Sequence, residues 1–400
     1  GITMHRLLFS CFLCLAASLV GADPNKPTEN GRIEIIDGQK IVRLQGSAYN
    51  IGYQHGRMLK SEIADNIARF LTPVLSSNQT KQPVIAHFME AIPMIVPHIP
   101  TALMEEMQGM ADAAEQPFSK ILLLNLFPEM FHCSAVTVNG EATSDGELYH
   151  VRVLDYAAGN GLQHTAVLAV VEPDSGYPFI NFTYAGFVGC VTGMNSEKIS
   201  IGEIGGKGYG RWDGVPMAFL LRTIVQHTSS LAEIKNILGT TARTCEYFYV
   251  FSDGKTGRSF GCQATPDYLQ FFDPGKSYSK NPPLQNTFDR PLLTPKGDMS
   301  IGKETFFEQP KDTLIISRGD HYDLLKERLL KNYGNIGLQD LKEAIKQPIA
   351  HKSNLHNAIF APETLDVWIS HAGTMNEPAC DQPYHHFNLK TLMDKSCQCQ

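Results

Sequence analysis

The spacing of apolar and polar residues changes along the chain, and the change comes near residue 132. Before it, apolar positions recur at helical spacing, which predicts helices over 51–71, 83–92 and 101–116 and an apolar stretch over 118–131. Residues 32–44 read as a strand or two ahead of them. After residue 132, short runs of β-branched and aromatic residues predict mostly strands.

The later elements alternate in groups rather than singly. The strands are expected over 165–171, 179–184, 198–204, 247–252, 259–264, 268–272, 358–360 and 364–370, and the helices over 215–227, 230–238, 322–331 and 339–346. Strands in runs and helices in pairs indicate antiparallel sheets with helices packed outside. The expected fold class is therefore α+β, compatible with a four-layer αββα sandwich.

A β-hairpin is predicted directly after the helical part. Segments 134–138 and 147–154 both have alternating, β-branched character, and two glycine-containing turn dipeptides lie between them. Closure at these turns places Cys133 opposite a residue between about 146 and 158. Arg152 and Asp155 fall in that window. The pattern thus predicts that a thiol, a cation and a carboxylate meet at one end of a sheet.

Composition and charge narrow the functional classes. The chain has 400 residues, of which 43% are hydrophobic, enough for one large domain or two small ones. Its formal net charge of −7 is mild, and without a basic stripe nucleic acid is not expected as a partner. The histidines lack metal-ligand spacing, and no nucleotide-binding glycine motif occurs. We expect no metal and no other cofactor.

The first residues have the pattern of a signal peptide over 4–22. A short basic segment precedes an apolar run over 7–20, and small residues follow at the expected cleavage point. That run is shorter than the roughly 20 residues that a spanning helix needs. We expect a protein of the secretory pathway, secreted or lysosomal, or periplasmic in a bacterium, without stable membrane insertion.

Cysteine usage agrees with such a compartment. Of nine cysteines, the signal peptide contains two, so seven remain, and an odd number predicts disulfides with one thiol left over. Cys133 is the natural free thiol. The alternative, that most are buried free cysteines, stays open. Asn78 and Asn181 begin glycosylation sequons, which matter in a eukaryotic host.

We interpret Cys133 as the nucleophile of an enzyme that cuts its own chain after His132. The α-amine released by the cut has a reference pKa of about 7.7–8.0, which suits a general base, and the thiol can then form a thioester. Asp155 is expected to orient the amine or hold the thiol proton. Arg152 is expected to keep Asp155 ionised and to lower the thiol pKa. Before the cut, the same thiol attacks the His132 carbonyl.

The tetrahedral intermediate of such a reaction needs hydrogen-bond donors. Asn195 and Asn286, both predicted to lie in loops, are the candidates for these oxyanion donors. Ser317 and Arg318, just before a predicted helix, are candidates for binding a substrate carboxylate or bracing the site.

Five motifs follow one another along the mature chain. They are the glycine-spaced stretch Gly46–Gly56, Glu105–Ala111, Cys133-Ser134 with Arg152-x-x-Asp155, Gly193-Met194-Asn195, and Gly214-Val215-Pro216 followed by Leu220-Leu221-Arg222. In this order they resemble the isopenicillin N acyltransferase family, and the bile-salt and penicillin V hydrolases, of the amino-terminal-nucleophile (Ntn) hydrolase superfamily. The resemblance implies that Cys133 is the nucleophile, Asp155 its partner and Arg152 the neighbouring cation. It also implies Asn195 and Asn286 as oxyanion donors and Ser317-Arg318 as a pair near the site.

The sequence therefore predicts a self-cleaving Ntn cysteine amidase or acyltransferase made as a zymogen. A fragment over 23–132 and a catalytic fragment over 133–400 are expected to stay associated. The substrate is expected to be a linear amide of an N-acyl amino acid, a small peptide or a lipid amide. Papain-like and serine-hydrolase motifs are missing. The alternative is a secreted, non-catalytic binding protein of the same fold.

Overall fold

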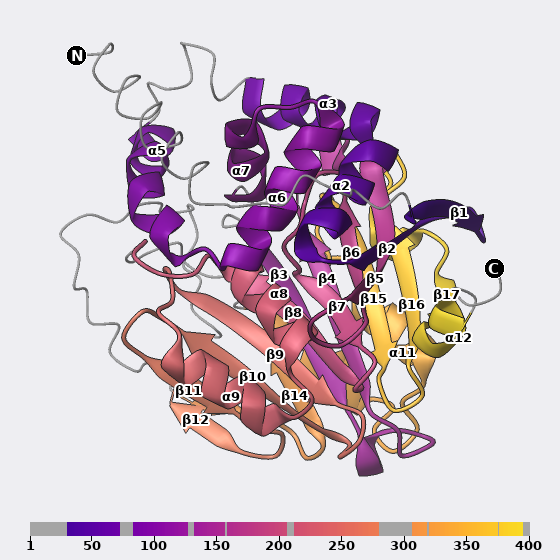
Figure 1. Cartoon of the computed structure of the whole chain (residues 1–400). Helices are drawn as coiled ribbons and strands as arrows, with labels where there is room; N and C mark the ends of the chain where they lie inside the picture. The colour runs from indigo at the N-terminus through magenta and orange to yellow at the C-terminus, as the bar shows by residue number, and fades with distance from the viewer. Residues whose placement is uncertain are drawn as a thin grey trace.

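The computed structural model describes residues 30–72, 83–126, 132–156, 158–205, 212–279, 306–317, 320–374 and 376–394. Fifteen of its strands form one hydrogen-bonded sheet that folds over into two layers, two more form a separate ribbon, and helices cover both outer faces (Figure 1). This architecture confirms the predicted αββα sandwich.

The N-terminal segment is mostly helical, as its apolar periodicity predicts. Two strands, β1 (Arg32–Ile36) and β2 (Gln39–Gly46), precede α2 (Ala48–Met58), α3 (Lys60–Asn66), the π-helical turn η1 (Ile67–Leu71), α5 (Pro83–Ile95), α6 (Thr101–Ala114) and α7 (Phe118–Leu126). One boundary differs from the prediction, since α5 continues through Pro93, which we expected to end it. A proline in the last turn removes only one hydrogen bond of the helix, which is why α5 can continue past Pro93 and end at Ile95.

The two layers of strands meet at β3 and β8. The first layer contains β1 and β2 followed by β5 (Ala166–Pro173), β6 (Phe179–Tyr184), β7 (Thr192–Asn195), β8 (Ile199–Gly205), β9 (Tyr247–Asp253), β10 (Arg258–Ala264) and β11 (Leu269–Phe272). The second contains β14 (Thr313–Ile316), β3 (His132–Val138), β4 (Tyr149–Asp155), β15 (Asn354–Ala361), β16 (Asp366–His371) and β17 (His385–Asn388). All named pairs are antiparallel except β2 with β5.

The remaining elements lie outside these layers. They are α8 (Met217–His227), α9 (Leu231–Thr240), α10 (Asp320–Leu330), α11 (Leu338–Ala344), α12 (Leu389–Asp394) and a separate ribbon of β12 (Ser277–Ser279) and β13 (Phe306–Glu308). Helices α2, α8 and α9 pack on the first layer, and α10 packs on β14 of the second.

The space between the two layers is apolar at one end. Side chains of β5 and β6 face those of β15 and β16, and the rings of Phe182 and Phe360 lie 6.1 Å apart. The buried members of this core include Leu168, Val170, Ile180, Ala358, Val367 and Ile369. Burial of this apolar surface is the main force that holds the layers together.

Toward β3 and β8 the contacts between layers become polar. His150 on β4 binds the Ser200 hydroxyl at 2.8 Å, and His356 on β15 binds the hydroxyls of Tyr184 and Thr192. Burial lowers the pKa of His150 to about 3 and that of His356 well below its ordinary value. Both rings are therefore neutral and act as hydrogen-bonding links between the layers.

The glycine-spaced stretch brings α2 and α6 into close contact. A Cβ atom on Gly52 would lie 1.7 Å from the Glu106 carbonyl oxygen, and one on Gly109 would lie 2.1 Å from that of Tyr49. The two backbones thus touch where a side chain would otherwise stand. These glycines serve packing of the helical layer.

We expect Gly52→Ala to destabilise the protein by about 3 kcal/mol, because backbone atoms of α6 cannot give way to the new methyl group. Urea denaturation followed by circular dichroism measures the change. Gly239→Ala is the matched control, since a Cβ atom there meets nothing within 4 Å in α9. A Gly52→Ala variant as stable as the wild type would contradict the close approach.

Candidate active site

The predicted hairpin is present, and its register places the nucleophile. Cys133 pairs with Leu154 across β3 and β4, and Ala135 pairs with Arg152. Directly opposite residues share a face of the sheet, so the thiol, the small Ala135 side chain and Arg152 lie on one face. The prediction that Cys133 lies opposite a residue of the 146–158 window is confirmed.

The proposed cleavage bond lies at the junction of the two layers. His132 pairs with Asp155 on β4 and also with Gly205 on β8, so strands of both layers flank the peptide bond before Cys133. In the structure β3 runs unbroken across this bond. The bond is thus held in an extended conformation beside the thiol that we expect to attack it.

A buried glutamate completes the contacts of the thiol. Cys133 Sγ donates to Glu203 Oε2 at 3.6 Å, and Arg152 Nη2 donates to the same oxygen at 3.3 Å. The Arg152 and Glu203 side chains are fully buried, so their ion pair is shielded from water. The structure therefore brings together a thiol, a carboxylate and a guanidinium.

The Arg152 guanidinium is held from three directions. Nη1 donates to the Val153 carbonyl at 2.7 Å, Nε donates to the Val191 carbonyl at 3.2 Å, and Nη2 binds Glu203. A planar cation held this way contributes a fixed positive charge rather than a mobile one.

The surroundings of Cys133 favour its neutral form. Burial raises the pKa of the thiol well above its ordinary value, and the negative charges of Glu203 and Asp155 act in the same direction. The Arg152 charge and hydrogen bond lower it. In the uncut chain the thiol therefore carries its proton, and attack requires a base, for which Glu203 is the bonded acceptor.

Asp155 lies close by but faces another partner. Its Oδ1 atom accepts a hydrogen bond from the His351 backbone N–H at 3.0 Å. Asp155 and Arg152 are three residues apart on one strand, so their side chains point to opposite faces. Glu203 is the carboxylate that hydrogen-bonds to both Cys133 and Arg152. The negative charge of Asp155 also acts on the thiol, and its role as partner of the nucleophile stays a prediction.

Glu203 is not among the predicted site residues, although the sequence contains one signal for it. The residue lies inside the predicted strand over 198–204, whose other members are mostly apolar or small. A charged residue in a strand buried on both faces is rare unless it is paired. Its partner lies 51 positions away on β4, and that distance hid the pair.

Asn195 has a different place from the one predicted. It ends β7, and its amide nitrogen donates to the carbonyl oxygens of Val225 and Thr228 at 2.8 Å each, at the end of α8. Its oxygen accepts from the backbone N–H groups of Glu197 and Ile199. Both hydrogens of this amide are already donated, so in this conformation Asn195 has no N–H free to bind an oxyanion.

Of the other candidate positions, Ser317 lies among the described residues. Ser317 follows β14 and shares a hydrogen bond of 2.8 Å with Ser134, whose side chain points to the face of β3 opposite Cys133. Asn286 and Arg318 lie outside the described residues, as do Asn78 and the expected signal peptide over 4–22.

Two findings bear on the expectations based on the secretory pathway, which were a glycan at Asn181 and either disulfides or buried free cysteines. Asn181 is buried in β6, and its amide donates to the Gly189 carbonyl at 3.0 Å, so the folded structure has no room for a glycan there. Within the described ranges no two cysteines form a disulfide, and Cys133, Cys190, Cys262 and Cys380 are buried thiols. The cysteines at 397 and 399 lie outside these ranges.

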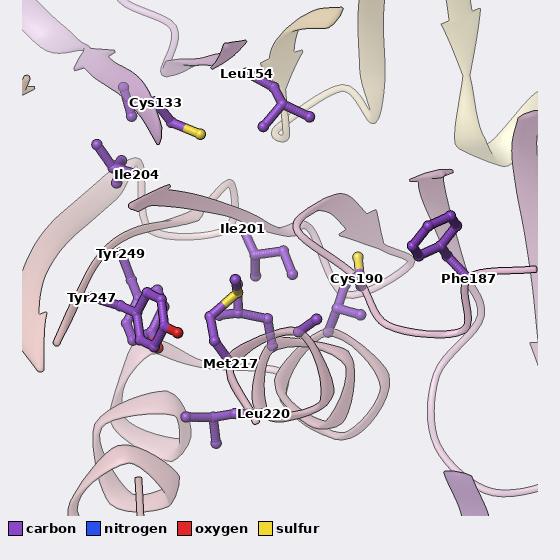
Figure 2. Close-up of a cluster of buried hydrophobic side chains, with 14 of the residues drawn as sticks. Cys133, Leu154, Phe187, Cys190, Ile201, Ile204, Met217, Leu220, Tyr247 and Tyr249 are labelled. Carbon is purple, nitrogen blue, oxygen red and sulfur yellow. The ribbon is translucent and has the colours of Figure 1, made fainter. Parts of the chain in front are cut away.

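Cys133 belongs to a cluster of buried apolar side chains. Figure 2 shows Cys133 and Leu154 facing Ile201, Met217 and Tyr249. We call this set the thiol cluster, which consists of Cys133, Leu154, Phe187, Cys190, Ile201, Ile204, Met217, Leu220, Tyr247 and Tyr249. Among the described residues no group of histidine, cysteine, aspartate or glutamate has the arrangement of a metal site. No described helix is both long and apolar enough to cross a membrane.

The fold and the buried thiol at the start of β3 define a class, the sandwich of Ntn hydrolase type. Comparisons with known proteins give likenesses of three kinds. No protein-family model matches the chain. The chain is 26% identical to protein dcd1A of Dictyostelium discoideum over 370 residues, which cover 84% of this chain and 79% of that protein.

The chain is also similar to acid ceramidases. It is 27% identical to acid ceramidase of Bos taurus over 217 residues, which cover 47% of this chain and 53% of that enzyme. The match thus spans about half the length of the enzyme. Neither of these relatives is named as an isopenicillin N acyltransferase, so the resemblance to that family in particular is not supported.

Solved structures resemble the chain only loosely. A Caenorhabditis elegans ortholog of N-acylethanolamine-hydrolyzing acid amidase has a TM-score of 0.42 at 11% identity, covering 64% of this chain and all of that one (100%). Penicillin V acylase from Agrobacterium tumefaciens has a TM-score of 0.38 at 9% identity, covering 60% of this chain and 83% of that one. The functional proposal below therefore depends on the geometry of the site.

Proposed function

We propose that the protein is a self-cleaving cysteine amidohydrolase whose nucleophile is Cys133. The observation that supports this most directly is the contact of the Cys133 thiol with the Arg152–Glu203 ion pair, beside a peptide bond flanked by both layers. A binding protein of the same fold has no need of a buried ion pair around a thiol. The experiment below distinguishes this enzyme from a non-catalytic binding protein of the same fold.

The first step of the proposal is maturation. Cys133 Sγ attacks the carbonyl carbon of His132 while the thiol proton passes to Glu203. The C–N bond of the peptide then breaks, the departing nitrogen takes up a proton, and a thioester joins the 23–132 fragment to Cys133. Water hydrolyses this thioester. The products are a carboxylate at His132 and a Cys133 with both a free thiol and a free α-amine.

The second step is turnover of a substrate amide. The new α-amine accepts the thiol proton, the sulfur attacks the substrate carbonyl, and the amine half leaves with a proton. Water then releases the acyl group from the thioester, and another amine in place of water gives acyl transfer. We propose that Asp155 orients the α-amine, because it pairs with His132 across the strands at the point of the cut.

The thiol cluster supports a substrate with an apolar acyl group. Beside the Arg152–Glu203 pair, the other buried side chains near Cys133 in Figure 2 are aliphatic or aromatic, and an acyl chain attached to the sulfur would lie against them. Similarity to enzymes named for ceramide, a lipid amide, points the same way. We propose an N-acyl lipid amide as the substrate class, acted on in a secretory compartment such as the lysosome.

Amino-terminal sequencing combined with intact mass tests the proposal. The purified protein is incubated at pH 4.5 and pH 7, and each fragment is identified. A fragment that begins Cys133-Ser134-Ala135 and hydrolyses a lauroyl amide of aminomethylcoumarin supports it. A chain that stays whole, and whose Cys133 reacts with iodoacetamide no faster than Cys190, supports the non-catalytic binding protein instead.

The two carboxylates are expected to differ in their effects. Glu203→Gln removes the acceptor of the thiol proton, so the cut should slow by about 100-fold, within the range for lost acid–base catalysis. Asp155→Asn should slow turnover by about tenfold, because it leaves the amine without a charged partner. It should slow the cut by a similar factor, because it changes the residue that pairs with His132 at the cleaved bond. Rates come from gel densitometry and from the coumarin assay. The matched control is Asp174→Asn at an exposed position. Full activity of Asp155→Asn would remove Asp155 from the mechanism.

A further inference from the structure

His55, in the glycine-spaced stretch, is buried in α2 and faces a loop of the other fragment. Its Nε2 atom accepts a hydrogen bond from the Gly186 backbone N–H at 3.0 Å. Only a neutral ring with its proton on Nδ1 can accept there. Gly186 has a φ of +95°, in the region that favours glycine, so the turn at this point cannot easily carry another residue.

Gly186 belongs to the 185–191 loop, which joins β6 to β7. Buried side chains of the N-terminal segment bind its backbone. Asn66 donates to the Ala185 carbonyl at 2.8 Å, and Asn125 both donates to the Gly186 carbonyl and accepts from the Val188 N–H. A buried loop must satisfy its backbone polar groups in this way. The N-terminal segment therefore determines the conformation of the 185–191 loop.

A buried ion pair between the two fragments adds to this attachment. Arg222 on α8 donates to the Val188 carbonyl at 2.6 Å and binds Glu106 of α6 through both terminal nitrogens, at 2.7 and 3.1 Å. Glu106 lies before the proposed cut and Arg222 after it. The loop is thus held from α2, α3 and α7 of one fragment and from α8 of the other, where Glu106 of α6 binds Arg222.

The far end of the loop reaches the active site. The Val191 carbonyl accepts hydrogen bonds from Arg152 Nε at 3.2 Å and from the Glu203 backbone N–H at 3.1 Å. Phe187 and Cys190 of the same loop belong to the thiol cluster (Figure 2). A shift of the loop therefore moves the carbonyl that orients Arg152 and part of the apolar wall around Cys133.

We propose that His55 is a positioning residue for this active site, because it holds the 185–191 loop and through Val191 fixes the Arg152 guanidinium beside Cys133. The inference depends on the proposed self-cleavage. It gives the glycine-spaced stretch two tasks: Gly52 lets α6 approach, and His55 connects α2 to the catalytic fragment.

Burial and the charges around His55 determine the pH range in which its ring can accept the hydrogen bond from Gly186. Burial lowers the pKa of His55 to about 4, the positive charge of Arg222 on α8 acts in the same direction, and the negative charge of Glu62 on α3 opposes them. The ring is therefore neutral above about pH 4. Below that pH a protonated Nε2 would face the Gly186 N–H, two donors would meet, and the hydrogen bond would be lost. Self-cleavage should then fail as the pH falls through this value.

The test measures the rate of self-cleavage, so it needs no substrate. Wild type, His55→Ala and His55→Gln are prepared as full-length precursors and incubated between pH 2.5 and 7, and the appearance of the fragment that starts at Cys133 is timed. Glutamine offers an amide oxygen to the Gly186 N–H but does not titrate. The matched control is His164→Gln at an exposed position. Circular dichroism at each pH establishes that each variant is folded.

We expect His55→Ala to be cut about tenfold more slowly at pH 6, the effect of about 1.4 kcal/mol on the barrier. His55→Gln should be cut within about threefold of the wild-type rate and stay active at least one pH unit further into acid. The inference is wrong if folded His55→Ala is cut at the wild-type rate, or if His55→Gln loses activity at the same acid pH as wild type. If the alanine variant does not fold, the lowest pH at which the glutamine variant is still cut tests the inference alone. If the wild type is never cut, the proposed self-cleavage is wrong, and this outcome is distinct from a failure of the His55 inference.

Discussion

The variant Cys133→Ala should remain a single uncut chain and show no amide hydrolysis, a loss of at least about 1,000-fold in both activities. The reason is that one sulfur atom performs both attacks, first on the His132 carbonyl and then on the substrate carbonyl. The Arg152–Glu203 pair stays in place without the thiol, but neither side chain can form the thioester. Intact mass after long incubation and the coumarin assay measure the two losses.

Two further variants make this result specific to the one thiol. Cys262→Ala removes another buried cysteine, on β10, and should be cut and active like the wild type. Cys133→Ser keeps a hydroxyl that is a weaker nucleophile, so slow cutting with little amidase activity is expected. Normal cutting of Cys133→Ala would show that another group or another protein breaks the chain, and the proposed function would be wrong.

Local signals explain why the sequence predicts the start of this site well. The pairing of Cys133 with Leu154 follows from turn residues and from two alternating strands within about 25 positions. The helices over 51–71 and 101–116 likewise follow from a period that repeats within each segment. The short strands β7 and β14 lack such a pattern, because four residues show too little alternation to separate a strand from a loop.

Long-range packing explains what the sequence did not predict. Glu203 lies 70 positions from Cys133 and meets it only because β8 and β3 come together where the two layers join. Asn195 looks like a loop asparagine in the sequence, yet the end of α8 takes both of its amide hydrogens. Both facts depend on how distant segments pack, which neither spacing nor composition encodes locally. The same holds for the cysteines, since their number cannot show which of them lie close together.

The second large effect concerns the ion pair between the two fragments. Glu106→Gln should lower the free energy of unfolding by about 3–5 kcal/mol, because it leaves the Arg222 charge buried without a counter-charge. The Glu106 and Arg222 side chains are 4% and 3% exposed, so water cannot replace the lost partner. Once the chain is cut, the loss should also weaken the association of the fragments. Urea denaturation of the precursor and size-exclusion chromatography of the cut protein measure the two effects.

A double-mutant cycle separates the charge from the packing around it. Replacing both residues with uncharged ones of similar size, as in Glu106→Gln with Arg222→Met, removes both buried charges together. The loss in the free energy of unfolding of the double variant should therefore be smaller than the sum of the losses of the two single variants. Glu327→Gln is the control, since its pair with Lys331 is 65% and 69% exposed and should change stability by less than about 0.5 kcal/mol. A Glu106→Gln variant as stable as this control would mean that the pair does not hold the fragments together, and that the side chains of Asn66, Asn125 and His55 do so without it.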